Sequence, residues 1–579
     1  MLDLLIRNGF VIDGTGAAGF HADVGIAGGK IVELGDVTTP ARRTLEAEGH
    51  AVTPGFVDLH THYDGQATWD GVLAPSSLHG VTSLVMGNCG VGFAPVRPTA
   101  HATLISLLEG VEDIPGSALA EGLTWDWESF PDYLDAIDRR HYAVDIGAYV
   151  PHAAVRAYVM GERGGDAHAK PSEDEIAAME EIVYAGLMAG AVGFSTSRTR
   201  NHKTKEGELI GTLYADSREL QLAARALRRA DRGICQLVSD AFLDPEESFA
   251  ATEMDLMEQI AVSSGRPLTF SLGQIASVPE RWRYLLRRAE AMVGKGLDIK
   301  AQVPARAIGA IAGFSTPINP FYLLPRYRAL PETDIPERLR LLAQPEVRAQ
   351  ILDEHRTLPA GSPFNDLHYG YDRMFRIGNP VDYEPHPDTS IGAEARRLGR
   401  DPLDYAYDVF LEEGGHRLIY IPVINYNGGN LSGAYELLTF EHSLYGLSDG
   451  GAHCGSICDA SFPTTMMSLW RQGNKQGQRI PIERIVHGYT RRNAEFVGWH
   501  DRGVIAPGYL ADVNVIDLEG LSLPPPEIVQ DLPAGGTRLL QRPSGYRYTV
   551  KSGEVSFDKG EWMGVLPGGL LRGEQRRPT

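Results

Sequence analysis

Short apolar runs and longer segments of helical periodicity alternate along the middle of the chain. Several of the segments between the runs carry apolar residues at the spacing of an amphipathic helix, and the one after Ser172 begins with a Ser172/Glu175 capping box. Repeated strand–helix units predict a parallel sheet, and about eight of them favour closure into a barrel. The runs rich in β-forming residues, which are typical of buried strands, are 80–90, 143–152, 191–198, 233–240, 267–274 and 298–306.

The two ends of the chain have a different pattern. Residues 3–12, 21–33 and 509–557 consist of short strand-like runs broken by glycine-rich turns. We therefore expect residues 1–51 and 509–579 to form one small sheet domain, assembled from both termini. Residues 52–508 then form the α/β domain.

The stretch 310–440 breaks the strand–helix alternation. It contains a polar helical piece at 336–355, an irregular aromatic segment at 364–380 and another helix at 401–415. We interpret it as an insertion over the C-terminal face of the barrel, because the strand–helix loops on that face build the active site.

Composition and charge restrict the possible partners. The 579-residue chain has 43% hydrophobic and 22% charged residues, which is ordinary for a globular protein. Its net charge of -21 argues against a nucleic-acid or anionic-membrane partner, since such contacts need clustered Lys and Arg. We find no signal peptide at the start and no run of roughly 18 apolar residues that could span a membrane. With only four scattered cysteines, these features predict a cytoplasmic protein; they do not constrain its oligomeric state.

The strongest candidate for chemistry is VTPGFVDLHTHYD, residues 52–64. In an extended strand His60 and His62 point to the same side, because side chains alternate with a period of two. Two imidazoles on one face at the end of a strand can bind one metal ion. The alternative is a solvent-facing pair in a loop, but the apolar strand and the Pro-Gly before the pair favour a metal site.

Two of these segments resemble a known family. PGFVDLHTH resembles the signature of the amidohydrolase superfamily, and GVTSLVMGNCGVGFAPVRP resembles the second strand of its N-acyl-D-amino-acid deacylase branch. The resemblance implies a distorted TIM (β/α)8 barrel and a β-sandwich built from both chain ends. It also makes Cys89 a metal ligand in place of the carboxylated lysine used elsewhere in the superfamily. A thiolate suits that role because coordination lowers its pKa, although a buried inert thiol is the alternative for Cys89.

LYGLSDGGAH, residues 444–453, resembles the last barrel strand of the superfamily. The resemblance implies that Asp449 binds the metal and moves the proton during hydrolysis. A local turn capped by Asp449 is the alternative. VPHAAVRAYVMG, residues 150–161, also fits the branch, with His152 on the third strand, so the resemblance spans nearly the whole chain.

The chain departs from the family at strands five and six, where the family normally supplies one histidine each. Gln236 stands near the first of these positions and Ser271 and Leu272 near the second. An amide oxygen is a poor zinc ligand and leucine is none. We therefore expect one Zn²⁺ ion and a lost or altered second position. The remaining ligands are His60, His62, Cys89 and Asp449; since four tight ligands would close the site, we expect Asp449 or Cys89 to bind loosely or the coordination to expand to five.

Substrate contacts are expected on the same face of the barrel. Gln274 stands where the family has a lysine that contacts the substrate carboxylate. Residues 194–208 offer Arg198, Arg200 and His202 beyond strand four, and arginine can grip a carboxylate through two hydrogen bonds. A solvated basic loop is the alternative for this segment, and His202 could instead be a replacement ligand or a general acid. His152 completes the predicted substrate-binding set.

These features predict a hydrolase of a C–N bond outside the peptide backbone, acting on a small molecule that carries a carboxylate. The first hypothesis is deacylation of an N-acyl (D-)amino acid, in which the metal activates water and Asp449 moves the proton. Hydrolysis of a cyclic amide, as in hydantoinase and dihydroorotase relatives, is the alternative within this class. The missing histidines motivate a second class, a barrel that has lost hydrolysis and binds a ligand or catalyses another reaction.

Overall fold

Eight parallel strands form the central barrel of the computed structural model, which describes residues 1–331, 334–358, 367 and 370–578. Neighbouring strands pair in parallel in the order of the chain. Each of the six predicted apolar runs contains one strand, from β7 to β12. The barrel strands are β6 (Phe56–Asp58), β7 (Val81–Met86), β8 (Asp145–Pro151), β9 (Gly193–Arg198), β10 (Ile234–Ser239), β11 (Leu268–Ser271), β12 (Ile299–Val303) and β16 (Ser443–Tyr445).

The first and last strands of the barrel meet just beyond their C-terminal ends. A parallel bridge joins Thr61 to Gly450. The backbone N–H of His62 donates to the carbonyl of Gly450 at 2.8 Å, and that of Asp449 donates to the carbonyl of His60 at 3.1 Å. Closure of the barrel therefore brings the segment with the two histidines against the segment with Asp449.

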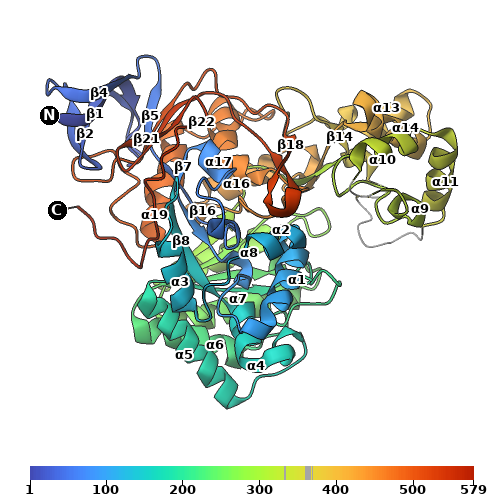
Figure 1. Cartoon of the computed structure of the whole chain (residues 1–579), viewed down its shortest axis with the longest axis horizontal. Coiled ribbons are helices and arrows are strands. Elements are labelled where there is room, and N and C mark those ends of the chain that lie inside the picture. The colour runs from blue at the N-terminus through green and yellow to red at the C-terminus, as the bar shows by residue number, and fades with distance from the viewer. Residues whose placement is uncertain (332–333, 359–366, 368–369, 579) are drawn as a thin grey trace.

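Amphipathic helices cover the outside of the barrel and join its strands (Figure 1). The first of them starts at the predicted capping box: Ser172 Oγ accepts from the N–H of Glu175, and the Glu175 carboxylate accepts from the N–H of Ser172. Leu220 and Leu227 are among the apolar residues buried against the strands. These helices are α5 (Glu173–Ala189), α6 (Ser217–Ala230), α7 (Glu247–Ser264) and α8 (Arg281–Val293).

Both ends of the chain contribute to a nine-stranded sheet with an apolar core of its own. Its β5 pairs with β1 from the N-terminal end and with β17 from the C-terminal end, and it leads directly into β6. The predicted fold class, a distorted TIM barrel with a small β domain built from both chain ends, is thus confirmed. The strands are β1 (Leu2–Val11), β2 (Phe20–Ala27), β3 (Lys30–Gly35), β4 (Ala41–Glu46), β5 (Ala51–Pro54), β17 (Val513–Ile516), β20 (Tyr546–Lys551), β21 (Glu554–Asp558) and β22 (Glu561–Trp562).

A separate helical unit leaves the barrel after β12 and returns before β16. It has its own core, in which the rings of Phe314 and Tyr407 pack edge to face, and it projects to one side of the molecule in Figure 1. The predicted irregular segment 364–380 lies partly outside the described residues. The strands and main helices of this unit are β13 (Ile308–Ala312), β14 (Phe375–Arg376), β15 (Ile419–Ile424), α10 (Ile335–Leu342), α11 (Pro345–Arg356), α13 (Ile391–Arg397) and α14 (Pro402–Phe410).

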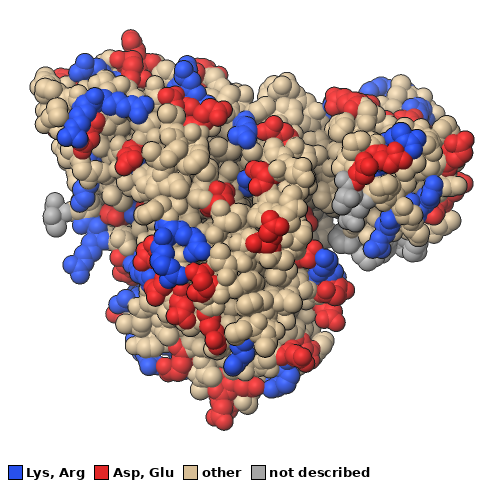
Figure 2. Space-filling view, viewed as in Figure 1, with Lys and Arg blue, Asp and Glu red and all other residues tan. Residues whose placement is uncertain are grey.

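The surface carries charges of both signs. Acidic and basic side chains are interspersed over the face shown in Figure 2, in a chain of net charge -21. Among the described residues, no helix combines the length and the apolar character needed to cross a membrane.

Candidate metal centre and active site

Three buried side chains from the first two barrel strands converge at the C-terminal rim. The Cys89 Sγ lies 3.3 Å from His60 Nε2 and 3.9 Å from His62 Nε2, and one donor atom from each residue lies within 4.8 Å of the others. Donors bonded to one zinc ion at about 2.0–2.3 Å with tetrahedral angles stand roughly 3.3–3.5 Å apart. The three side chains therefore fit a single ion and leave room in its coordination for a further group.

Cys89 reaches this position through an unusual backbone conformation. It lies in the short turn η3 (Asn88–Gly90) that follows β7, with a φ of 59°, a value that L-residues rarely adopt. Its N–H donates to Gln236 Oε1 of β10 at 3.1 Å. The turn thus directs the thiol toward the histidines of the neighbouring strand and ties it to strand five.

Asp449 completes the group from the last barrel strand. Its Oδ1 lies 3.3 Å from His60 Nε2 and 3.5 Å from His62 Nε2. Its side chain is 18% exposed, whereas those of the two histidines are 1% exposed, so it is the one that a substrate can reach. Burial raises the pKa of Asp449, but the hydrogen bond from His62 and the proximity of His60 outweigh it and lower the pKa below its usual value, so that the carboxyl is ionised.

Without a cation, burial keeps the two imidazoles and the thiol of this cluster uncharged. Burial lowers the pKa of His60 and lowers that of His62 to about 4, which keeps the imidazoles neutral, as ligands must be. Burial raises the pKa of the Cys89 thiol well above its usual value, and the charges of Glu112, Asp449 and Asp64 raise it further. A bound divalent cation would reverse this effect, because coordination deprotonates a thiol.

Two residues behind the histidines escaped the sequence analysis. Gln302 of β12 lies with Oε1 2.7 Å from His60 Nδ1, and Glu112 lies with Oε1 3.3 Å from His62 Nδ1. Contacts of this kind fix the ring orientation of a metal-binding histidine. Glu112 ends α1 (His101–Glu112), in which Leu104 and Leu108 are also buried. Leu104, Leu108 and Glu112 are spaced by four residues and therefore lie on one face of the helix, which was the one indication in the sequence that Glu112 is buried.

Strands five and six carry no histidine at the rim. Gln236 of β10 and Ser271 of β11 are buried there, and both Gln236 Nε2 and Ser271 Oγ lack a hydrogen-bond partner. The loss or alteration of the second metal position remains a prediction. Polar amide and hydroxyl groups stand where the family supplies imidazoles.

The structure gives three of the predicted substrate contacts partners within the chain. Arg198 forms a two-pronged ion pair with Glu253, which is 1% exposed. The guanidinium of Arg200 pairs with Asp240 at 3.2 Å and with Asp244, and its side chain is 55% exposed. His152 is fully buried, with its ring nitrogens 2.9 Å from Thr196 Oγ1 and 3.1 Å from Glu219 Oε1. Contact of these residues with a substrate remains a prediction.

His202 and Gln274 occupy different surroundings. His202 follows β9, with Nδ1 2.7 Å from Ser197 Oγ. Burial lowers its pKa to about 3, and the electrostatic effects of His62, His453, Asp449 and His60 on that pKa are smaller. The backbone N–H of Gln274 donates to Asn425 Oδ1 at 2.6 Å, and its buried Oε1 has no partner.

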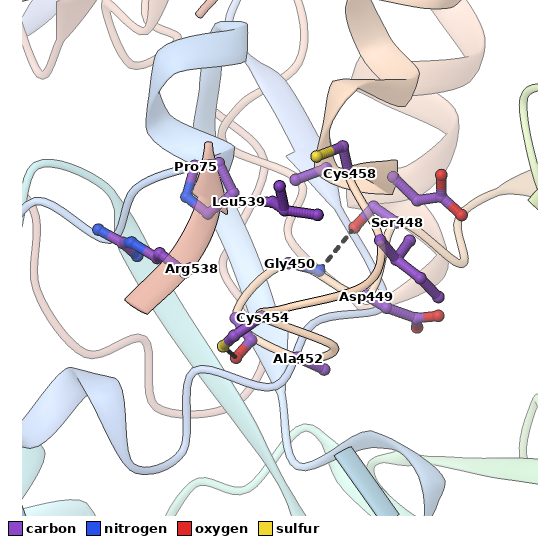
Figure 3. Close-up of a pocket in the computed structure, with 13 residues that line it drawn as sticks. Pro75, Ser448, Asp449, Gly450, Ala452, Cys454, Cys458, Arg538 and Leu539 are labelled. Carbon is purple, nitrogen blue, oxygen red and sulfur yellow. Dashed lines mark hydrogen bonds between the residues drawn. The ribbon is translucent and has the colours of Figure 1, made fainter. Parts of the chain in front are cut away.

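A small pocket lies behind the Asp449 loop (Figure 3). Its volume of about 20 Å³ is enough for one water molecule. The Ser448 Oγ in its wall lies 2.6 Å from Asp58 Oδ2 and 3.0 Å from the carbonyl oxygen of His60, and both of these oxygens can accept its hydroxyl proton. Cys454 and Cys458 lie at separate ends of this pocket as free thiols, away from the metal-binding cluster.

Comparison with known proteins agrees with this geometry. Residues 43–557 match the model of the amidohydrolase family. An uncharacterized protein of Mycobacterium tuberculosis is 27% identical over 89% of this chain and 84% of its own length. The D-aminoacylase of Alcaligenes xylosoxydans xylosoxydans is 36% identical over 34% of this chain and 37% of its own length.

Solved structures share the whole fold. A D-aminoacylase structure covers 100% of both chains with a TM-score of 0.65 at 22% identity. The N-acyl-D-glutamate deacylase of Bordetella bronchiseptica, complexed with zinc and a phosphonate inhibitor, covers 99% of both chains with a TM-score of 0.63 at 22% identity. Because the family model spans most of the sequence, the chain belongs to the amidohydrolase family.

Proposed function

We propose that this amidohydrolase removes the acyl group from N-acyl D-amino acids or closely related amides, with one Zn²⁺ held by His60, His62 and Cys89. The convergence of these three buried donors at the C-terminal rim is the observation that carries the proposal. Zn²⁺ bound there would polarise the amide carbonyl and lower the pKa of water. D-aminoacylase and N-acyl-D-glutamate deacylase among the relatives support the substrate class.

Asp449 moves the proton in this proposal. Hydrolysis adds water to the carbonyl carbon, breaks the C–N bond and leaves a carboxylic acid and an amine. The attacking water must lose a proton and the departing nitrogen must gain one. The ionised, partly exposed carboxylate of Asp449 lies beside both histidines. It can take the proton from the attacking water and deliver it to the departing nitrogen.

A single ion is sufficient for this scheme. One D-aminoacylase structure of the same fold, with a TM-score of 0.64, is described in terms of one-metal activation and second-metal attenuation of a binuclear centre. In the present chain Gln236 and Ser271 stand at the strand-five and strand-six positions. Strands five and six therefore supply no imidazole to the second half of a binuclear centre.

The substrate carboxylate is assigned to the rim beyond β9. Arg198 is held by the buried Glu253, whereas the Arg200 side chain is 55% exposed at its ion pairs with Asp240 and Asp244. Arg200 is therefore the better placed of the two to turn toward a substrate. The net charge of -21 and the four free cysteines support a cytoplasmic enzyme that acts on small molecules rather than on nucleic acid.

The test combines metal analysis with a substrate panel. Zinc is quantified in the purified protein, and turnover is measured on N-acetyl-D-amino acids, their L-enantiomers and hydantoins, before and after chelation. We expect about one zinc per chain and turnover of the D-substrates that is lost on chelation and restored by Zn²⁺. Turnover of hydantoins alone would indicate a cyclic amide hydrolase. A protein with no bound metal and no chelation-sensitive activity would contradict the proposal and favour a ligand-binding barrel.

A further inference from the structure

We propose that Glu112 is a positioning residue: its side chain fixes His62 at the metal site, and its backbone carbonyl holds the Asp449 loop beside it. The inference rests on the proposed metal site and assigns a role to a side chain outside the predicted ligand set. Glu112 touches neither Cys89 nor Asp449 through a hydrogen bond, so its effect must pass through the residues that do the chemistry.

The carboxylate of Glu112 faces the back of His62. It is 2% exposed, and its Oε1 lies 3.3 Å from His62 Nδ1, while neither of these two atoms has a hydrogen-bond partner. A buried carboxylate is costly unless a donor or a cation compensates it. A proton on His62 Nδ1 turned toward Glu112 would compensate both unpartnered atoms and leave the lone pair of Nε2 directed toward Cys89 and Asp449, as a metal ligand requires.

The same end of α1 holds the loop that carries Asp449. The Glu112 carbonyl accepts from the N–H of His453 at 2.5 Å, and Asp113 Oδ2 accepts from Ser456 Oγ at 2.8 Å. Asp449 and His453 have φ angles of 48° and 49°. Such left-handed conformations in residues other than glycine persist only when the surroundings hold them.

The two metal-binding histidines differ in the group behind them. Gln302 offers His60 a neutral amide oxygen, and Glu112 offers His62 a carboxylate. A polar oxygen behind a metal-binding imidazole, whether from an amide or a carboxyl group, orients the ring and raises its strength as a ligand. Glu112 thus strengthens the His62 side of the site.

Glu109 supplies a matched control on the same helix. It lies one turn before Glu112 and pairs with Lys205 at the surface, with 22% of its side chain exposed. A surface ion pair of this kind contributes little to stability. Glu109→Gln therefore removes the same charge from α1 without touching the metal site.

The experiment measures Zn²⁺ affinity by competition with a chelator for the wild type, Glu112→Ala, Glu112→Gln and Glu109→Gln. Thermal unfolding of each metal-free protein is recorded alongside. We expect Glu112→Ala to weaken Zn²⁺ binding roughly 10–100-fold, Glu112→Gln to weaken it less because an amide oxygen remains beside Nδ1, and Glu109→Gln to leave it unchanged. With Co²⁺ in place of Zn²⁺, the visible spectrum should change in Glu112→Ala and stay the same in the control.

Unchanged Zn²⁺ affinity in a folded Glu112→Ala variant would overturn the inference. If that variant does not fold, Glu112→Gln decides: weaker binding than in Glu109→Gln supports the role, and equal binding overturns it. A wild-type protein that binds no stoichiometric metal would refute the proposed metal site itself. That outcome is distinguishable because it is seen before any variant is compared.

Discussion

The two sides of the barrel rim are built from different chemistry. On the side of β6, β7 and β16, the donors of His60, His62 and Cys89 face one another beside Asp449. On the side of β9, β10 and β11, arginine side chains pair with acids, and Gln236 and Ser271 take the positions near the rim. The first side can bind a cation, whereas on the second side basic groups and acids already neutralise one another.

The difference gives the two sides separate tasks, metal binding and substrate contact, whereas in a binuclear centre both sides would bind metal. The buried carboxyl groups around the first side, Glu112 and Asp64, have pKa values raised mainly by burial, and among the described contacts neither pairs with a lysine or an arginine. A divalent cation would compensate them. We therefore assign metal chemistry to the first side and contact with the substrate to the second.

The largest expected effect comes from removal of the thiol. Cys89→Ala should abolish stoichiometric Zn²⁺ binding. Its activity should fall by more than roughly 100-fold, because loss of a residue behind a ligand already costs roughly 10–100-fold. Zinc content and turnover of an N-acyl-D-amino acid measure both effects. Cys235→Ala, which removes a buried thiol of β10, serves as the control and should retain its zinc. Full zinc content in Cys89→Ala would break the distinction between the two sides.

Asp449→Asn separates the proton carrier from the ligands. We expect kcat to fall roughly 10²–10⁴-fold while zinc stays bound, because an amide cannot take the proton from water. Steady-state kinetics and zinc analysis of the same preparation check this. Undiminished turnover would remove Asp449 from the reaction, and loss of zinc would make it primarily a ligand.

The two arginines of the second side should respond differently. Arg198→Met leaves the buried Glu253 without its partner and should cost about 3–5 kcal/mol of unfolding free energy. Arg200→Met, at an exposed pair, should cost about 0–1 kcal/mol and instead raise KM for substrates that carry a carboxylate. Urea unfolding measures the stability of both variants, and kinetics on substrates with and without a carboxylate measure the change in KM. A rise in KM in Arg198→Met alone would exchange the two roles.

The smallest effect concerns acid stability. Burial raises the pKa of Glu219, but the hydrogen bond with His152 and the charges of His152 and Arg156 outweigh it and lower the pKa to about 2. The carboxylate therefore stabilises the fold above its usual pKa of 4.5, and this contribution is lost as the pH falls toward 2. Glu219→Gln should be less stable at pH 7 and should lose less stability than the wild type between pH 5 and pH 3. Parallel stability curves in that range would contradict the assignment.

Much of the fold could be predicted because local patterns repeat along the chain. Six apolar runs each contain a barrel strand, and the Ser172/Glu175 capping box begins α5 as expected. The period of the apolar residues reflects which side of each element is buried, and that is a local property. The similar pattern of short strands and glycine-rich turns at the two ends predicted one sheet domain built from both, and in the structure β5 pairs with both β1 and β17.

The site could be predicted only in part. His60 and His62 share a strand, so their common direction follows from the sequence, and the family resemblance supplied Cys89 and Asp449 as expected ligands. Glu112 escaped notice because one acidic residue at the end of a helix resembles many that face solvent. Gln302 lies 242 residues from His60, so nothing local connects the two.

The sequence by itself determined the order of strands and helices, the placement of the histidines at the end of the first barrel strand and the absence of histidine at strands five and six. Only the tertiary structure decided which charges meet. It set Arg198 against Glu253 and Glu112 against His62, across 55 and 50 residues of chain. The reason is physical: backbone periodicity acts over a few residues, whereas the pairing of buried charges depends on which distant segments the closed barrel brings within a few ångströms.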